Sequence, residues 1–403
     1  MTNREASSSV FEILAVFLRL GLTSFGGPIA HLGYFRTEFV ERRKWLTDAH
    51  YGEVVALCQF LPGPASSQVG LAIGLMRGGY LGALAAWIGF TLPSVLIMIA
   101  VAYGLGGSDH PIVGGLVHGL KLVAVAIVAQ AVIGMARTLC PDRATAGIAF
   151  AALVFMSLIG GALAQVAVIA FGAFLGFGLL RKGRESGEGG APSAPSFGVS
   201  AGVGSAAGLL FLACLVGLPL AAAAWPSEAL SLFDAFYRAG ALVFGGGHVI
   251  LPLLENAVVG KGWMDSDTFL SGYGAAQAIP GPLFTLAAYL GAAGDQMPNG
   301  WAGGALALAG IFLPSFFLVP AGLSMWARIR TARAARSGIA GVNAAVVGLL
   351  TAALYDPIFV SIVHQPHDFA LAAGGLALLQ VGRVHPILVV VLGTVAGILL
   401  TLL

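Results

Sequence analysis

The sequence predicts an all-α polytopic membrane protein, an inverted repeat of two homologous domains with broken helices or re-entrant hairpins. Three observations lead to this fold class: the composition, a set of motifs that occurs twice, and a reversal of loop charge between the copies. Hydrophobic residues make up 58% of the 403 residues, charged residues only 9%, and the mean hydropathy is +0.91. A soluble protein has about 25% charged residues. The long apolar runs therefore indicate spanning helices rather than a barrel.

The same composition excludes several functional classes. A net charge of +2 gives no basic surface for nucleic acid. The three cysteines, Cys58, Cys140 and Cys214, are too scattered for a disulfide framework or a metal site, so we expect no metal and no cofactor. No HExxH or P-loop motif is present, so we expect no enzyme. The polar N-terminus lacks a cleavage site after the following apolar run, which predicts that it is retained.

Five short motifs occur in the same order in both halves of the chain. The spacing between them differs by at most three residues, which indicates a duplicated unit. The first copy has them at 17–21, 24–28, 45, 59–64 and 89–94, and the second at 236–240, 243–247, 263, 277–282 and 310–315. We therefore divide the chain into a first domain (1–180), a linker with an extra transmembrane helix (181–227) and a second domain (228–403).

Loop charge reverses between the two copies. The loop after the first glycine motif carries Arg36, Arg42, Arg43 and Lys44, whereas its counterpart has Lys261 as its only cation. The loop at 106–111 has no Lys or Arg, whereas its counterpart at 326–337 has four arginines. Because cytoplasmic loops are enriched in Lys and Arg, the two copies are expected to have opposite orientations in the membrane.

The same loop charges predict which segments cross the membrane. Cytoplasmic residues on both sides of the proline-glycine-proline (PGP) motif make that segment a re-entrant hairpin, and the glycine motif is interpreted as a second hairpin. Full crossings are then expected at 80–104, 112–136, 144–160, 163–180, 202–224, 300–325, 338–356, 369–382 and 385–402.

The broken helices are the predicted binding site. Free N–H groups at a helix start, helped by the helix dipole, are a common backbone solution for an anion, and glycine permits close approach. The alternative is that these motifs only kink packed helices. The residues of the breaks are Gly26, Gly27, Pro62, Gly63, Pro64, Gly245, Gly246, Gly247, Pro280, Gly281 and Pro282.

Three cations lie within apolar segments. Arg19 and Arg238 occupy equivalent positions before the two glycine motifs, and an arginine in the hydrocarbon costs roughly 2.5–3.5 kcal/mol on insertion scales. We interpret them as charge compensation for an oxyanion; snorkelling, or pairing with Glu12 or Asp234, is the alternative. Lys121 is a third candidate, without a symmetric twin.

Polar side chains flank the breaks and can bind an oxyanion without adding charge, although interhelical hydrogen bonding is the alternative for each. These candidates are Gln59, Ser66, Ser67, Gln277 and Thr285. His31, His248 and Glu53 are candidates for carrying a coupling proton, with a structural role as the alternative. The proline-serine pairs at 93–94 and 314–315 are interpreted as helix kinks.

Taken together, the glycine motifs at 25–28 and 244–255, the two PGP motifs and the two leucine-proline-serine (LPS) motifs resemble the bidomain chromate ion transporters over nearly the whole chain. The resemblance implies export of chromate, a tetrahedral dianion, by alternating access, with chromate resistance, in the inner membrane of a bacterium. A transporter of another oxyanion such as sulfate remains open, as do an anion channel of the same architecture and, more distantly, a membrane reductase. The expected partners are the anion and the lipid bilayer, and a homodimer is possible.

Overall fold

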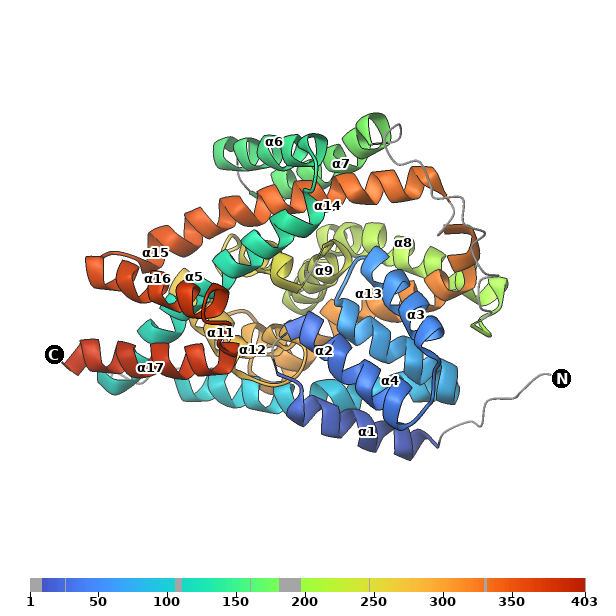
Figure 1. Ribbon diagram of the computed structural model, residues 1–403, viewed down its shortest axis with the longest axis horizontal. Helices are drawn as coiled ribbons and strands as arrows, with labels where there is room; N and C mark the ends of the chain where they lie inside the picture. Colours follow the sequence, from blue (N-terminus) through green and yellow to red (C-terminus); the bar gives the residue numbers. More distant parts are fainter. Residues whose placement is uncertain are drawn as a thin grey trace.

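The computed structural model describes residues 9–25, 27–105, 111–159, 161–180, 197–245, 247–329 and 332–402, and these residues form helices without any strand. Figure 1 shows α1 and α4 along one edge of the molecule and α6 and α7 along the opposite edge. The predicted all-helical inverted repeat is therefore confirmed.

The first repeat consists of two short hairpins followed by long helices. Its elements are α1 (Val10–Thr23), α2 (Gly27–Arg36), the π-helix η1 (Thr37–Arg42), α3 (Asp48–Phe60), α4 (Ala65–Leu105), α5 (Pro111–Leu139), α6 (Arg143–Ile159) and α7 (Gly161–Leu179). Helix α8 (Ala201–Ala224) then leads to the second repeat.

The second repeat follows the same order, with more interruptions. Its elements are α9 (Glu228–Ala241), η2 (Gly247–Val249), α10 (Ile250–Val258), α11 (Ser266–Ala278), η3 (Leu283–Thr285), α12 (Leu286–Ala293), α13 (Gly300–Ile329), α14 (Arg333–Ala353), η4 (Leu354–Phe359), α15 (Val360–Ile362), α16 (Pro366–Gln380) and α17 (Pro386–Leu402).

The hairpin arms are too short to span a bilayer. Helices α1 and α9 have 14 residues each and α3 and α11 have 13, whereas a span needs about 20 residues. Their starts are fixed by N-caps at equivalent positions of the two repeats. Thr47 accepts a hydrogen bond from the backbone N–H of His50, and Asp265 accepts one from that of Thr268. Each such cap is worth about 1 kcal/mol.

Five helical segments of the described residues are long and apolar enough to span a membrane: 65–104, 112–139, 201–224, 300–329 and 334–362. Within α4, Gly78 and Gly79 leave the helical conformation, so the hairpin arm ends there and the crossing begins near residue 80, as expected. The four other expected crossings correspond to α6, α7, α16 and α17, which have 15 to 19 residues. The chain is a multi-pass membrane protein.

The two repeats are interlocked. Helix α17 of the second repeat packs along α5 of the first, and α7 of the first packs along α14 of the second. Glycines make these contacts close: a Cβ on Gly119 of α5 would lie 2.3 Å from the carbonyl oxygen of Gly393, and one on Gly341 of α14 would lie 2.0 Å from that of Gly172. Small residues of this kind allow helix backbones to meet within a bilayer.

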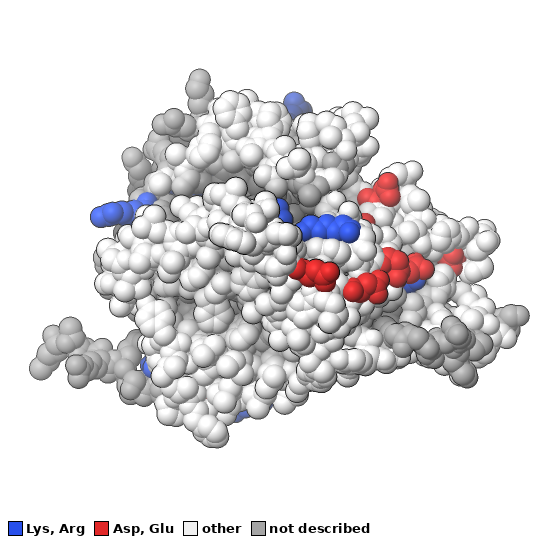
Figure 2. Space-filling view, turned by 180° about the vertical axis from the view of Figure 1, so that it is seen from behind, with Lys and Arg blue, Asp and Glu red and all other residues white. Residues whose placement is uncertain are grey.

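Charge is segregated on the surface. On the face drawn in Figure 2, every visible acidic side chain lies in the half toward α15 and α17. The charged side chains visible in the other half are all Lys or Arg. This separation has the sense expected from the loop charges.

Helix α8 is the least buried of the span-length segments, because only 6% of its most apolar window is covered by the rest of the protein. Most of its surface is therefore free to contact lipid.

The interlocking contact predicts a large effect of a single methyl group. Gly341→Ala places a Cβ against the α7 backbone, and such overpacking costs about 1–3 kcal/mol. Thermal unfolding of the purified protein in detergent is expected to show a lower Tm.

Gly147→Ala is the matched control, because this glycine of α6 has open space around its missing Cβ. It is expected to leave Tm unchanged or raise it, since alanine favours a helix. Equal Tm values for the two variants would contradict the close α7–α14 contact.

Candidate functional site

The two glycine breaks face each other in the centre of the molecule. Helix α1 ends at Thr23, and the chain re-enters a helix at Gly27, whose φ is +77°. In the second repeat, Gly245, which aligns with Gly26, has a similar φ of +78°. A Cβ on Gly247 would lie 3.2 Å from the Pro28 ring, so the two breaks contact each other.

Each PGP turn is bound to the glycine break of the other repeat. The backbone N–H of Gly63 donates to the carbonyl oxygen of Val243 at 2.7 Å, and that of Gly281 donates to the carbonyl oxygen of Ser24 at 2.9 Å. Both glycines have a positive φ, +121° and +101°, which other residues rarely adopt. The pair of bonds has two-fold symmetry and satisfies backbone groups that a broken helix would leave unpaired.

The LPS serines complete this contact, a role that the interpretation as helix kinks did not include. A Cβ on Gly281 would lie 2.8 Å from Ser94 Oγ, and one on Gly63 would lie 3.1 Å from Ser315 Oγ. The Gln68 amide Nε2 donates to the Pro62 carbonyl at 2.6 Å and lies 3.2 Å from Ser315 Oγ. Each LPS motif therefore packs on the PGP turn of the other repeat.

A small cavity lies where the breaks and turns meet. Its volume is about 70 Å³, and a water needs only ~10–15 Å³ of such space. We name it the tip cavity. The lining residues that matter here are Gly27, Pro28, Gln130, Gln277, Gly281 and Pro386.

Helix starts from both repeats meet at the tip cavity. Helix α2 begins at Gly27, α17 begins at Pro386, and Leu283 begins η3, which continues into α12. A helix N-terminus carries roughly half a positive charge, and proline in its first turn removes an N–H that would have no partner. The cavity therefore offers a positive potential, although none of the described residues that line it is a lysine or arginine.

Buried polar atoms without a hydrogen-bond partner among the described residues gather around the breaks and turns. Gln277 Nε2, which lines the tip cavity, is one of them. Buried polar groups are nearly always paired, so such orphans mark a place for water or a ligand. The others in this region are Ser24 Oγ, His31 Nε2, Ser67 Oγ, Gln68 Oε1, Thr91 Oγ1 and Asn343 Oδ1.

The predicted arginines lie outside the tip cavity and form ion pairs. Arg19 pairs with Glu38, and Arg238 pairs with Asp234 on its own helix at 2.6 Å. For Arg238, the structure shows the ion pair with Asp234 that was considered as the alternative to anion binding. Arg19 pairs with Glu38, a partner that the sequence did not suggest. A role for either arginine in binding substrate stays a prediction.

The other charged candidates also have partners. Lys121 Nζ lies 2.9 Å from the Asp267 carboxylate, which joins α5 to the start of α11. The Glu53 carboxylate accepts a hydrogen bond from the indole N–H of Trp326. Neither pair lines the tip cavity.

The smaller polar candidates are placed unequally. His31 is buried, with its Nδ1 3.3 Å from Ser66 Oγ, and the Thr285 hydroxyl donates to the Pro282 carbonyl at 2.8 Å. Gln277 lines the tip cavity, whereas its counterpart Gln59 is exposed.

Of the predicted residues that the structure describes, only Gly27, Gln277 and Gly281 line the tip cavity. Pro64 and Pro280 lie in the two PGP turns without lining it. Gly26, Gly246 and the side chain of His248 lie outside the described residues. Sequence reasoning missed Gln130 and Pro386, because neither belongs to a repeated motif and only the packing of α5 and α17 brings them to the site.

Comparison with known proteins agrees with this architecture. A chromate transporter family model matches residues 11–177 and 230–398, which is one match for each repeat. The chain is 27% identical to the chromate transport protein of Pseudomonas aeruginosa over 96% of this chain and 91% of that protein. It is 26% identical to the chromate transport protein of Cupriavidus metallidurans, over 88% of this chain and 84% of the relative. No solved structure matches the chain.

The PGP contact yields a test of site geometry. Gly281→Ala forces an alanine into a positive φ, which costs about 1–2 kcal/mol, and also places its Cβ against Ser94 Oγ. Thermal unfolding should show a larger loss of Tm than for Gly79→Ala, where φ is +62° and the space is open.

A double-mutant cycle isolates the clash from the strain. Adding Ser94→Ala to Gly281→Ala removes the hydroxyl and should restore part of the lost Tm. Strict additivity of the two substitutions would show that Ser94 does not pack on the PGP turn.

Proposed function

Because the chain belongs to the chromate transporter family, we propose that it carries chromate across the membrane and exports it from the cytoplasm by alternating access. The tip cavity is the proposed binding site. The observation that carries the proposal is the meeting of helix starts from both repeats at one small cavity that also holds the buried, unpaired amide of Gln277.

The chemistry of the tip cavity suits a dianion that must be released again. Burying a charge without compensation is very costly, and helix starts together with amide donors supply that compensation. A full positive charge in a low-dielectric site would attract a dianion much more strongly and slow its release. Arg19, Arg238 and Lys121 are each held by a carboxylate away from this cavity, which favours donors without net charge as the ligands.

Unequal exposure of equivalent residues supports alternating access. Gln277 lines the tip cavity and is half-buried, whereas Gln59 is exposed, although the two repeats share the same motif. In an inverted repeat the two halves exchange conformations when the protein changes its open side. We propose that Gln59 takes the place of Gln277 in the opposite state.

The membrane potential supports export. A dianion that leaves a cell with a negative interior gains roughly 2.3 kcal/mol per charge per 100 mV, so no coupling ion is required. We place the protein in the inner membrane of a bacterium, where such export confers chromate resistance. Sulfate, which has the same shape and charge, is the alternative substrate.

The proposal predicts the effect of removing one donor. Gln277→Leu should lower chromate uptake into inverted membrane vesicles roughly tenfold or more, because a hydrogen bond to a charged group is worth about 1.5–3 kcal/mol. Gln296→Leu is the matched control and should transport normally, because this half-buried glutamine lies outside the tip cavity and donates to the Glu228 carbonyl.

The same vesicles separate the alternatives. Saturation and trans-stimulation are expected for a carrier, whereas unitary currents would identify a channel. Full activity of Gln277→Leu would contradict the tip cavity as the binding site, and complete suppression by excess sulfate would assign the protein to sulfate.

A further inference from the structure

A second, larger cavity lies between α1 and the helical segment formed by α2 and η1, which returns beside it. Its volume is about 640 Å³, and it is formed by α1, α2 and η1. It shares no lining residue with the tip cavity. We name it the arginine cavity. The lining residues used below are Arg19, Thr23, Thr37, Glu38 and Arg42.

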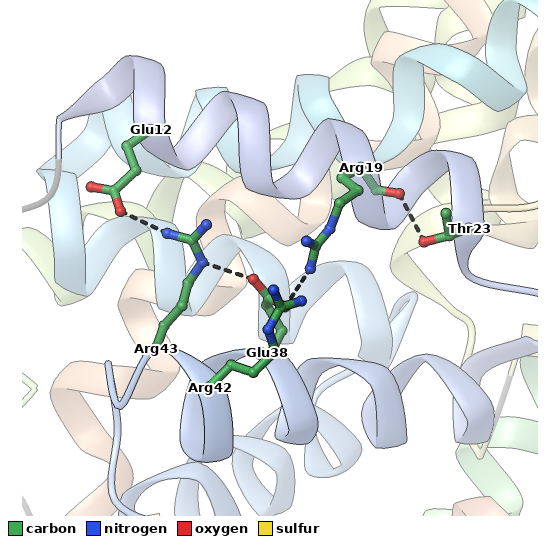
Figure 3. Close-up of polar contacts among 6 residues, drawn as sticks. All are labelled: Glu12, Arg19, Thr23, Glu38, Arg42 and Arg43. Carbon is green, nitrogen blue, oxygen red and sulfur yellow. Dashed lines mark hydrogen bonds and ion pairs between the residues drawn. The ribbon is translucent and has the colours of Figure 1, made fainter.

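One buried carboxylate holds three guanidinium groups at this cavity. Glu38 accepts hydrogen bonds from Arg43 at 2.7 Å, from Arg42 at 3.2 Å and from Arg19 (Figure 3). Arg43 also donates to Glu12 at 2.7 Å. Three arginines and two glutamates leave one positive charge in excess.

The cations face solvent and the carboxylate does not. The side chains of Arg19 and Arg42 are 48% and 62% exposed, whereas that of Glu38 is 4% exposed. An anion that enters the cavity therefore meets the arginines first. Arg19 and Arg42 each donate to the same Glu38 oxygen, Oε2, so two guanidinium groups converge on one point where an oxygen of a tetrahedral oxyanion can be bound.

Glu38 remains ionised at neutral pH. Burial raises its pKa, but the hydrogen bond from Arg43 and the charges of Arg19, Arg42 and Arg43 outweigh burial and hold the pKa below its ordinary value. The residue lies in η1, outside the five span-length segments. Its negative charge is therefore present across the physiological range and is lost only as the pH falls through this lowered pKa.

We propose that the arginine cavity is a second anion site, at which the Glu38 carboxylate occupies the guanidinium groups until a free tetrahedral oxyanion exchanges for it. This inference rests on the proposed function, because it supplies a capture site on the cytoplasmic side predicted for residues 36–44. Exchange of one anion for another keeps Arg19 and Arg42 paired, while Glu38 keeps its hydrogen bond from Arg43 at 2.7 Å, so that no buried charge is left uncompensated.

The test measures protection of a thiol in the arginine cavity. Thr37→Cys is introduced into the full-length protein with Cys140→Ser and Cys214→Ser, while the buried Cys58 is retained. Labelling by a charged maleimide is followed in phosphatidylcholine nanodiscs. Sulfate is the probe, because chromate oxidises thiols, and chloride at equal ionic strength controls for screening.

Sulfate is expected to slow the labelling, and chloride is not. Adding Glu38→Gln removes the internal competitor and should lower the half-protecting sulfate concentration by roughly five- to tenfold. Glu41→Gln on the same π-helix, whose carboxylate pairs with Arg36 and lies outside the cavity lining, should leave it unchanged. Glu38→Asp keeps the charge on a shorter side chain and gives a smaller shift, which provides a second variant if Glu38→Gln does not fold.

Several results would overturn the inference. If sulfate leaves the labelling rate unchanged in Thr37→Cys and in all its Glu38 and Glu41 variants, no free oxyanion binds in the arginine cavity. Protection by added phosphatidylglycerol alone, unaffected by sulfate, would assign the arginines to a lipid phosphate. If the protein transports chromate in vesicles but sulfate does not protect the thiol, the arginine cavity is rejected and the proposed function stands. If sulfate protects the thiol but no chromate is transported, the proposed function is rejected and the arginine cavity stands.

Discussion

The structure depends on the need to satisfy backbone groups where helices break inside the membrane. Two reciprocal hydrogen bonds meet this need, from Gly63 to the Val243 carbonyl and from Gly281 to the Ser24 carbonyl. An unpaired backbone group in hydrocarbon costs several kcal/mol, so each repeat can keep its broken helices only in the presence of the other. The proposed binding site therefore lies in the interface between the repeats.

This dependence explains why the repeats interlock. Helices α17 and α7 each leave their own repeat and pack on the long helix of the other through glycine contacts. The arrangement brings the start of α17, at Pro386, to a cavity whose other walls include residues of the first repeat such as Gly27. A motion that separates the repeats must also alter this cavity. In the proposed transport cycle, opening of the protein to one side is therefore coupled to a change at the proposed anion site.

Much of the architecture could be predicted because it follows from local patterns in the sequence. Repeated motifs predicted the duplication, and loop charge predicted both the inversion and the hairpins. The partners across the repeats could not be predicted, because Ser94 and Gly281 are brought together by packing and share no spacing rule. The same holds for Arg19, whose partner Glu38 lies on another helix, and for Gln130, which no motif marks.

The central claim is that chromate binds at the tip cavity rather than at an arginine pair. Anomalous diffraction at the chromium edge, from crystals of the full-length protein grown with chromate, tests it most directly. The account predicts a chromium peak within hydrogen-bond reach of Gln277 and the start of α2. A peak confined to the surroundings of Arg19, with an empty tip cavity in a protein active in transport, would contradict it.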